Sequence, residues 1–262
     1  MTSYEPGTPC WVDLGSPDIE ASVEFYNALL GWDVEESENP EQTGGYRMAL
    51  LDGKSVAGMM PLMQEGQPPA WTTYVSVEDA DATAVAVKQA GGSALAEPMD
   101  VMDIGRMAVF ADPAGAVFGV WQPRGFVGAS LVNEPSAFCW SEINTRDPGA
   151  AKSFYGDVFG WTFEDREFEG TGTYTTINVG DRAVGGLFDM TGRVPEEVPP
   201  NWLVYFAVED ADATLAKLRE LGGQVPMGPV DLAGVGRFAV VQDSFGATFA
   251  VIAPNSDGQE NA

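Results

Sequence analysis

"CWVDLGSPDIEASVEFYNALLGW" (residues 10–32) recurs with little change as "CWSEINTRDPGAAKSFYGDVFGW" (residues 139–161). In the first copy, Ser16-Pro17-Asp18 predicts the start of a helix, with proline at its first position. Apolar residues between Ile19 and Leu30 then recur on one helix face, and Gly31 ends the helix. The phrase therefore predicts a strand followed by an amphipathic helix, and the chain contains it twice.

The repeat extends well beyond this phrase. "YRMALLDGKSVAGMM" (46–60) matches "YTTINVGDRAVGGLF" (174–188), and "PPAWTTYVSVEDADAT" (68–83) matches "PPNWLVYFAVEDADAT" (199–214). The sequence therefore predicts a tandem duplication of one domain. The expected boundaries are 1–127 for the first domain, 128–255 for the second and 256–262 for a polar, flexible tail.

The later part of each half adds strands around a second helix. The strand "WTTYVSV" (71–77) leads into Asp79, which can cap a helix that ends at Gly91-Gly92. Two further strands are expected at about 106–111 and 116–122, separated by the turn "DPAG". Strands outnumber helices in each half, so the predicted fold class is α+β.

Three phrases of the first half, "DIEASVEFYNALLGW", "VEDADAT" and "GRMAVFADPAGAVFGVW", resemble the vicinal oxygen chelate superfamily, and so do their counterparts in the second half. This superfamily includes glyoxalases, bleomycin-resistance proteins and extradiol dioxygenases. The resemblance implies two tandem glyoxalase-like domains, each built of two βαβββ units that form a half-open barrel around a cavity.

The same resemblance implies a divalent metal on the cavity floor of most enzymes of this type, held by histidine, glutamine or glutamate. The matching positions of this chain carry other side chains, namely Trp11, Thr72 and Gly119 in the first half and Trp140, Leu203 and Ala250 in the second. The chain has no histidine at all. Zn²⁺, Fe²⁺ and Ni²⁺ are held by imidazole or thiolate in most sites. We therefore expect no metal and no other cofactor, and a metal-dependent glyoxalase or dioxygenase is disfavoured.

The replacements suggest a roomier aromatic pocket. Alternate residues of a strand share one face, so Trp11 should lie beside Asp13, and Trp140 beside Glu142. Trp121 should face inward from the last strand of the first half. An indole next to a carboxylate suits a planar ligand, and a cationic one in particular.

Further candidate ligand contacts come from equivalent positions of the two halves. They are Tyr46 with Tyr174, Tyr74 with Tyr205, and Arg106 with Arg237. Each has a simpler alternative, because strand aromatics often belong to a core. The arginines could also pair with Asp100 and Asp231.

Composition narrows the choice of partners. Asp and Glu number 39 against 13 Lys and Arg, a net charge of −26, which disfavours nucleic acid and anionic membranes. The charge fits solubility or a high-salt habitat, and it also fits attraction of a cationic ligand. No apolar run is long enough to span a bilayer, so a cytoplasmic protein is expected. Cys10 and Cys139 are expected to be buried strand residues rather than a disulfide.

Three kinds of function remain open. The favoured one is a metal-free binding protein of the bleomycin-resistance type for an aromatic, optionally cationic, secondary metabolite or antibiotic. The alternative is a cofactor-free enzyme of hydroxylase-associated, cyclase or isomerase type, with Asp13 or Glu142 as catalytic base and an oxidoreductase as a partner for any redox step. A structural scaffold is the third. The chain is expected to be a monomer or a homodimer.

Overall fold

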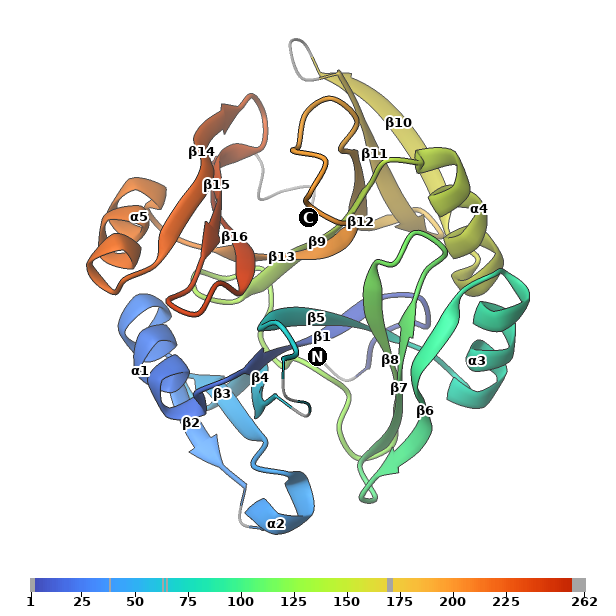
Figure 1. Cartoon of the computed structure of the whole chain (residues 1–262), viewed down its shortest axis with the longest axis horizontal. Coiled ribbons are helices and arrows are strands. Elements are labelled where there is room, and N and C mark those ends of the chain that lie inside the picture. The colour runs from blue at the N-terminus through green and yellow to red at the C-terminus, as the bar shows by residue number, and fades with distance from the viewer. Residues whose placement is uncertain (1–2, 38, 63, 65, 169–171, 256–262) are drawn as a thin grey trace. The chain divides into compact units, whose positions relative to one another are not determined.

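The computed structural model describes residues 3–37, 39–62, 64, 66–168 and 172–255 (Figure 1). The predicted flexible tail, 256–262, lies outside the described residues. Within them, no helix is both long enough and apolar enough to cross a membrane.

The first repeat follows the predicted order of strands and helices. Its elements are β1 (Pro9–Ser16), α1 (Ile19–Leu30), β2 (Asp33–Glu36), α2 (Pro40–Thr43), β3 (Arg47–Leu51), β4 (Lys54–Pro61), β5 (Ala70–Ser76), α3 (Ala80–Gln89), β6 (Ser93–Val101), β7 (Gly105–Ala111) and β8 (Val117–Pro123).

The second repeat has the same order, but its described residues include no counterpart of the short α2. Its elements are β9 (Phe138–Thr145), α4 (Pro148–Phe159), β10 (Thr162–Phe168), β11 (Gly172–Val179), β12 (Arg182–Asp189), β13 (Asn201–Ala207), α5 (Ala211–Glu220), β14 (Gln224–Leu232), β15 (Gly236–Gln242) and β16 (Thr248–Pro254).

Each repeat forms an eight-stranded sheet with the same topology. The strand order is β2-β3-β4-β1-β5-β8-β7-β6 in the first repeat and β10-β11-β12-β9-β13-β16-β15-β14 in the second. The pairs β1–β4 and β5–β8 are parallel, whereas the outer strands pair in antiparallel hairpins. The predicted α+β class and the two glyoxalase-like domains are confirmed.

The helix signals identified in the sequence are present, with one correction. Asp18 caps α1 by accepting a hydrogen bond from the backbone N–H of Ala21, and Gly31 ends the helix in the left-handed conformation. Pro17, expected at the first helical position, precedes this cap instead. In the second repeat Pro148 does occupy the first turn, behind the cap Asp147. The caps thus stand at equivalent positions of the two repeats, with the proline before the cap in the first and after it in the second.

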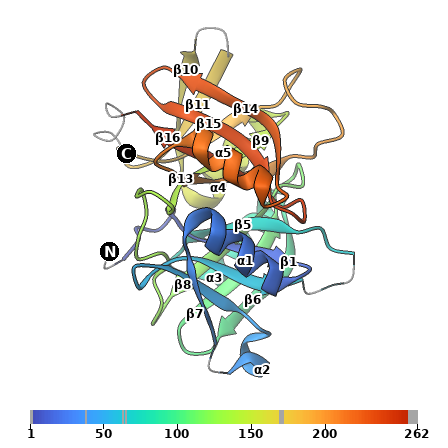
Figure 2. The ribbon, with the colours of Figure 1, turned by 90° about the vertical axis from the view of Figure 1, so that its left-hand side faces the viewer.

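Contacts divide the chain into two compact units, each of which combines segments of both repeats. The α3/α4 unit comprises residues 1–10, 73–128 and 140–203, and the α1/α5 unit comprises 11–72, 129–139 and 204–262. Helices α3 and α4 lie side by side in the first of these (Figure 1), and α1 and α5 do so in the second (Figure 2). The domain boundary at residues 127/128 remains a prediction about the sequence repeat, and neither unit coincides with it.

An aromatic cluster forms the core of the α1/α5 unit. The Tyr26 ring stacks on Trp32 at 5.5 Å and meets Trp71 edge-on at 5.4 Å. The indole N–H of Trp71 donates to the Tyr26 hydroxyl at 3.0 Å, and that hydroxyl donates to Asp243 at 3.1 Å. Buried polar groups are costly unless they are hydrogen-bonded, so this chain of bonds allows the polar atoms to lie inside the core.

The α3/α4 unit repeats this arrangement with the equivalent residues. Tyr155 stacks on Trp161 at 5.5 Å, accepts a hydrogen bond from the Trp202 indole at 2.9 Å and donates to Asp112 at 3.1 Å. In both units the tyrosine and the aspartate come from different repeats. Each core is therefore completed by both halves of the chain.

Alternate side chains of strand β1 point to the two opposite faces of the sheet. Val12 and Leu14 belong to the core beneath α1. Trp11 and Asp13 therefore point to the opposite, helix-free face of the sheet, as predicted from the period of two. This helix-free face carries the candidate site.

Candidate functional site

In the α1/α5 unit, Trp11, Tyr46 and Asp13 form a chain of polar contacts on the helix-free face. The indole N–H of Trp11 donates to the Tyr46 hydroxyl at 2.7 Å, and that hydroxyl donates to Asp13 Oδ2 at the long distance of 3.5 Å. An indole nitrogen can only donate, so the single tyrosine proton is directed to the carboxylate. The structure thus brings Tyr46, a separate candidate in the sequence, to Trp11 and Asp13, which were expected to lie side by side.

The α3/α4 unit contains the equivalent set. The indole N–H of Trp140 donates to the Tyr174 hydroxyl at 2.9 Å, and this hydroxyl bonds to Glu142. Trp11, Asp13 and Glu142 each expose 7% of their surface or less. We call each set a Trp–Tyr–carboxylate chain.

The environment keeps both tyrosines protonated. Burial, together with the negative charge of Asp13, raises the pKa of Tyr46 well above its ordinary value. Burial and the charge of Glu142 do the same to the pKa of Tyr174. Each repeat therefore presents an indole next to a protonated tyrosine hydroxyl that bonds to a carboxyl oxygen.

Tyr74 and Trp121 lie on the helix-free face of the α3/α4 unit, each above a glycine. The Tyr74 ring covers Gly119 so closely that a methyl group there would overlap it, and the Trp121 ring covers Gly105 in the same way. The Trp121 indole N–H donates to the carbonyl oxygen of Phe126 at 2.7 Å. Gly119 stands where the resemblance places a metal ligand, so an aromatic ring fills that space.

The corresponding face of the α1/α5 unit differs. Tyr205 pairs in register with Ala250 rather than with a glycine, and its ring lies 6.3 Å from that of Phe238. Ile252 stands opposite Phe238, at the place that Trp121 occupies in the first repeat. The two repeats thus share the Trp–Tyr–carboxylate chain but differ in the aromatic residues of the last strands.

Arg106 and Arg237 lie away from these aromatic residues. Arg106 bonds Asp81, in the first turn of α3, at 2.9 Å and Asp100 at 3.1 Å. Arg237 bonds Asp212, in the first turn of α5, at 3.1 Å and Asp231 at 2.7 Å. The ion pairs considered in the sequence are confirmed, and both guanidinium groups face the helices. Their role as ligand contacts stays a prediction.

The two cysteines are free thiols. Cys10 is buried, and its thiol donates to the carbonyl oxygen of Tyr74 at 3.5 Å. Burial raises the pKa of Cys139 to about 12 and that of Cys10 further still. A raised pKa leaves little thiolate at neutral pH, so neither residue has the properties of a reactive cysteine.

The residues at four of the positions where the resemblance implies metal ligands do not suit a divalent metal. Trp11, Trp140, Gly119 and Ala250 offer no side-chain lone pair for coordination. Across the described residues, no group of three or more Asp, Glu or Cys side chains is placed to hold a metal ion, and the chain has no histidine. The donor atoms of the described residues therefore do not fit the metal that the fold family implies.

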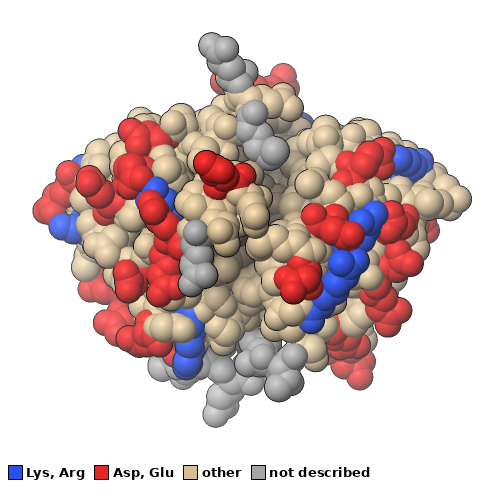
Figure 3. All heavy atoms as spheres, turned by 90° about the horizontal axis from the view of Figure 1, so that it is seen from below, with Lys and Arg blue, Asp and Glu red and all other residues tan. Residues whose placement is uncertain are grey.

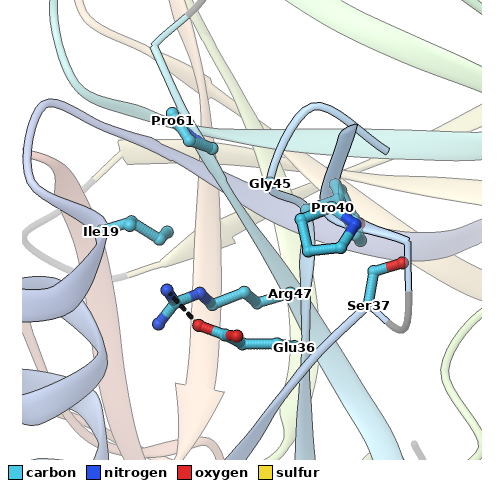
Figure 4. A pocket seen from close by; sticks show the side chains of 8 residues that line it. Ile19, Glu36, Ser37, Pro40, Gly45, Arg47 and Pro61 are labelled. Carbon is cyan, nitrogen blue, oxygen red and sulfur yellow. Dashed lines mark ion pairs between the residues drawn. The ribbon is translucent and has the colours of Figure 1, made fainter. Parts of the chain in front are cut away.

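Two small pockets, absent from the sequence predictions, lie at equivalent places of the repeats. In the first repeat a pocket of about 100 Å³ lies beside the start of β3, between Ile19, Pro40 and Pro61 (Figure 4). In the second a pocket of about 200 Å³ lies between Lys152 and Asp189.

Each pocket is crossed by an ion pair, Arg47 with Glu36 at 2.6 Å in the first and Lys152 with Asp165 at 2.6 Å in the second. Each pocket thus already contains one ion pair, and Asp189 adds a further carboxyl group to the lining of the second.

The sequence also missed the role of Tyr26 and Tyr155. Both stand at the same place in the duplicated phrase, and Asp112 and Asp243 both begin a repeated turn. These matches are visible in the sequence, but nothing in it indicates that the tyrosine of one repeat would contact the aspartate of the other.

Acidic side chains dominate the face shown in Figure 3, where lysine and arginine lie scattered among them. This distribution agrees with the net charge of −26. Cationic molecules are therefore favoured in the encounter with this surface.

Comparison with known proteins yields one family model, described as the Glyoxalase/Bleomycin resistance protein/Dioxygenase superfamily. It matches residues 10–120 and again 138–251. CFP32 from Mycobacterium bovis, provisionally named a glyoxylase, is 42% identical over 97% of both chains. The anthracycline biosynthesis protein DnrV from Streptomyces peucetius is 40% identical over 96% of this chain and 95% of its own.

Solved structures with much lower identity share the fold. The Mn(II)-bound glyoxalase from Novosphingobium aromaticivorans has a TM-score of 0.64 at 17% identity, covering 95% of this chain and 82% of its own. The 2,3-dioxygenase LapB from Pseudomonas sp. KL28 has a TM-score of 0.65 at 12% identity, covering 97% and 96%.

Proposed function

Because the chain belongs to the Glyoxalase/Bleomycin resistance protein/Dioxygenase superfamily, we propose that it binds an aromatic small molecule without a metal, as bleomycin-resistance proteins do. The ligand would be a secondary metabolite or antibiotic, and a positive charge on it would strengthen binding. Sequestration of such a compound is the function that this arrangement supports best.

The Trp–Tyr–carboxylate chain is the observation that carries this proposal. It occurs in both repeats, and its indole stands at the position where the resemblance to the family implies a first metal ligand. Stacking of a flat ligand on an aromatic ring contributes roughly 0.5–1.5 kcal/mol beyond the burial of area. An ammonium over an indole contributes roughly 0.5–2 kcal/mol more. Asp13 and Glu142 supply the matching negative charge.

The relative DnrV supports the chemical class of the ligand. Its name refers to anthracycline biosynthesis. Anthracyclines combine a planar ring system with an amino sugar in many members, and so present a flat face and a cation together. This pairing matches the indole and carboxylate of each repeat.

A second candidate is a cofactor-free enzyme that acts on a secondary metabolite. Asp13 and Glu142 are buried, and each contacts a tyrosine that keeps its proton, as an acid and base pair would require. In this reading the carboxylate removes a proton from the substrate and an oxidoreductase partner performs any redox step. The biosynthetic name of DnrV favours retaining this candidate.

The proposal is tested by titration of tryptophan fluorescence and of melting temperature. Doxorubicin supplies a flat cationic probe, its aglycone doxorubicinone lacks the amino sugar, and MnCl₂ and ZnCl₂ supply metals. We expect saturable quenching and a higher melting temperature with doxorubicin, and weaker effects with the aglycone. A melting shift with the metals and no response to either aromatic compound would refute the proposal.

Turnover distinguishes the two candidates. Conversion of a polyketide aromatic by the protein alone, lost in Asp13→Asn or Glu142→Gln while binding persists, would establish the enzyme. Binding without any conversion would establish the sequestering protein.

A further inference from the structure

We propose that Gly58 and Gly186 are positioning residues of the two binding sites. Each glycine leaves the space in which the tyrosine hydroxyl lies between the indole N–H and the carboxylate. The ligand then meets an indole and a carboxylate in a fixed arrangement. This inference rests on the proposed function and explains how the site is held in shape.

The strand register places each glycine directly beside a carboxylate. Asp13 of β1 pairs with Gly58 of β4, and Glu142 of β9 pairs with Gly186 of β12, both in parallel strands. Paired residues of neighbouring strands point to the same face of a sheet. Both glycines therefore open onto the helix-free face at the level of the carboxylate.

The tyrosine hydroxyl takes up the space of the missing side chain. A methyl group on Gly58 would overlap the hydroxyl of Tyr46, and one on Gly186 would overlap the hydroxyl of Tyr174. The methyl group at Gly186 would also approach the indole nitrogen of Trp140 to 3.0 Å. The same overlap in both repeats shows that the two tyrosines occupy equivalent positions.

Backbone conformation does not account for these glycines. Among the described residues, many glycines have a left-handed φ, but Gly58 and Gly186 are not among them. Their backbone is therefore accessible to alanine, and what a side chain there would have to displace is the tyrosine, together with the Trp140 indole at Gly186. Glycine inside a strand otherwise weakens it, so its presence at both positions points to the close approach of another group.

Arg47 and Thr175, the residues that follow Tyr46 and Tyr174, are hydrogen-bonded on the face of the sheet opposite to the helix-free face. Arg47 bonds Glu36, its partner in register, as Figure 4 shows. In the second repeat Thr175 donates to Asp165 at 2.6 Å, and Asp165 also pairs with Lys152. With the backbone held in this way, a methyl group at Gly58 or Gly186 must displace the tyrosine side chain itself.

Two readouts test this inference, one of them independent of any ligand. The first is the NMR spectrum of ¹⁵N-indole tryptophan, in which the N–H of Trp11 reports its bond to Tyr46. Gly58→Ala should shift the Trp11 resonance, assigned by loss in Trp11→Phe, and leave that of Trp140 in place. Gly186→Ala should do the reverse. Gly149→Ala, in the first turn of α4 and clear of both sites, is the control and should shift neither.

The second readout is the affinity for doxorubicin, measured by calorimetry. Gly58→Ala or Gly186→Ala should weaken binding at the altered repeat at least tenfold, with Gly149→Ala unchanged. Tyr46→Phe should match Gly58→Ala, and the double variant should be no weaker than either, because both changes remove the same contact.

The outcomes separate the two proposals. Unchanged indole resonances together with unchanged affinity in both glycine variants would overturn the positioning role. Additive losses in the double variant would also overturn it, because they would indicate general damage to packing. If the native protein does not bind doxorubicin, the proposed ligand class fails, while the indole resonances still decide how the tyrosines are held.

Discussion

The Tyr26 hydroxyl, in the first repeat, donates a 3.1 Å hydrogen bond to Asp243 in the second. The Tyr155–Asp112 pair has the same distance and comes from the repeats in the opposite order. Duplication alone would pair each tyrosine with the aspartate of its own repeat. The exchange means that each repeat supplies a polar partner to the core of the other.

Tyr26→Phe should lower the free energy of unfolding by about 2–4 kcal/mol, because it leaves the Trp71 indole and Asp243 without this shared hydroxyl in the core. Urea denaturation followed by far-UV circular dichroism measures the change. Tyr155→Phe should behave alike, as the matched variant of the other unit. A midpoint equal to that of the native protein in both variants would show that the buried hydroxyls do not stabilise the fold.

A fragment of residues 1–127 should not fold alone. Phe118 of the first repeat and Tyr155 and Trp202 of the second pack in one cluster, and Trp32 packs against Phe206. Near-UV circular dichroism should show no fixed aromatic environment in this fragment or in 128–255. Mixing the two should restore the native spectrum. Cooperative thermal unfolding of either fragment by itself would contradict the exchanged cores.

The stability of the protein should fall steeply at alkaline pH. Burial raises the pKa of five tyrosines well above the ordinary value, namely Tyr4, Tyr26, Tyr46, Tyr155 and Tyr174. These residues keep their protons in the folded state above about pH 10, whereas the unfolded chain loses them. Unfolding then releases protons, so each tyrosine lowers the free energy of unfolding by about 1.4 kcal/mol per pH unit.

Absorbance at 295 nm during a pH titration measures this effect. The five tyrosines should ionise only as the near-UV circular dichroism signal is lost, and Tyr46→Phe should reduce the pH dependence of the free energy of unfolding by one group. Ionisation of all tyrosines near pH 10 in a protein that stays folded would contradict the burial of their hydroxyls.

The sequence predicted the fold well because its signals are local and occur twice. Alternation in β1 correctly placed Trp11 and Asp13 on one face, and the caps Asp18 and Gly31 delimited α1. The approach of Tyr46 to that pair depends on how β3 folds over β4, which no local pattern reveals. The overlap with Gly58 becomes visible only when the strands are in register.

Arg106 and Arg237 show that equivalent positions in the two repeats do not by themselves identify residues of the site. Arg106 and Arg237 occupy the same turn of each repeat, which made them candidates for the site. Each alternates with residues of the helix-free face and so points to the helices, where it pairs with Asp81 or Asp212 in the first helical turn. The alternative, ion pairs with Asp100 and Asp231, followed from opposite charge and closeness in the sequence. These local features were sufficient to predict both ion pairs.

Salt should stabilise the protein. A net charge of −26 makes the folded state repel itself, and the Debye length falls from about 30 Å at 0.01 M to about 8 Å at 0.15 M salt. The melting temperature should rise between 10 mM and 500 mM NaCl. The association rate of a cationic probe such as doxorubicin should fall over the same range. A lower melting temperature at high salt would indicate that the ion pairs, such as Arg106 with Asp81, outweigh the overall repulsion.

The binding of an aromatic ligand by the indoles is tested most directly by calorimetric titration of doxorubicin into the native protein and into Trp11→Leu/Trp140→Leu. We expect saturable binding to the native protein and about tenfold weaker binding to the variant, because stacking at each indole is lost. Equal affinity in the two proteins, or no binding to the native protein, would contradict the assignment of these indoles to the ligand site.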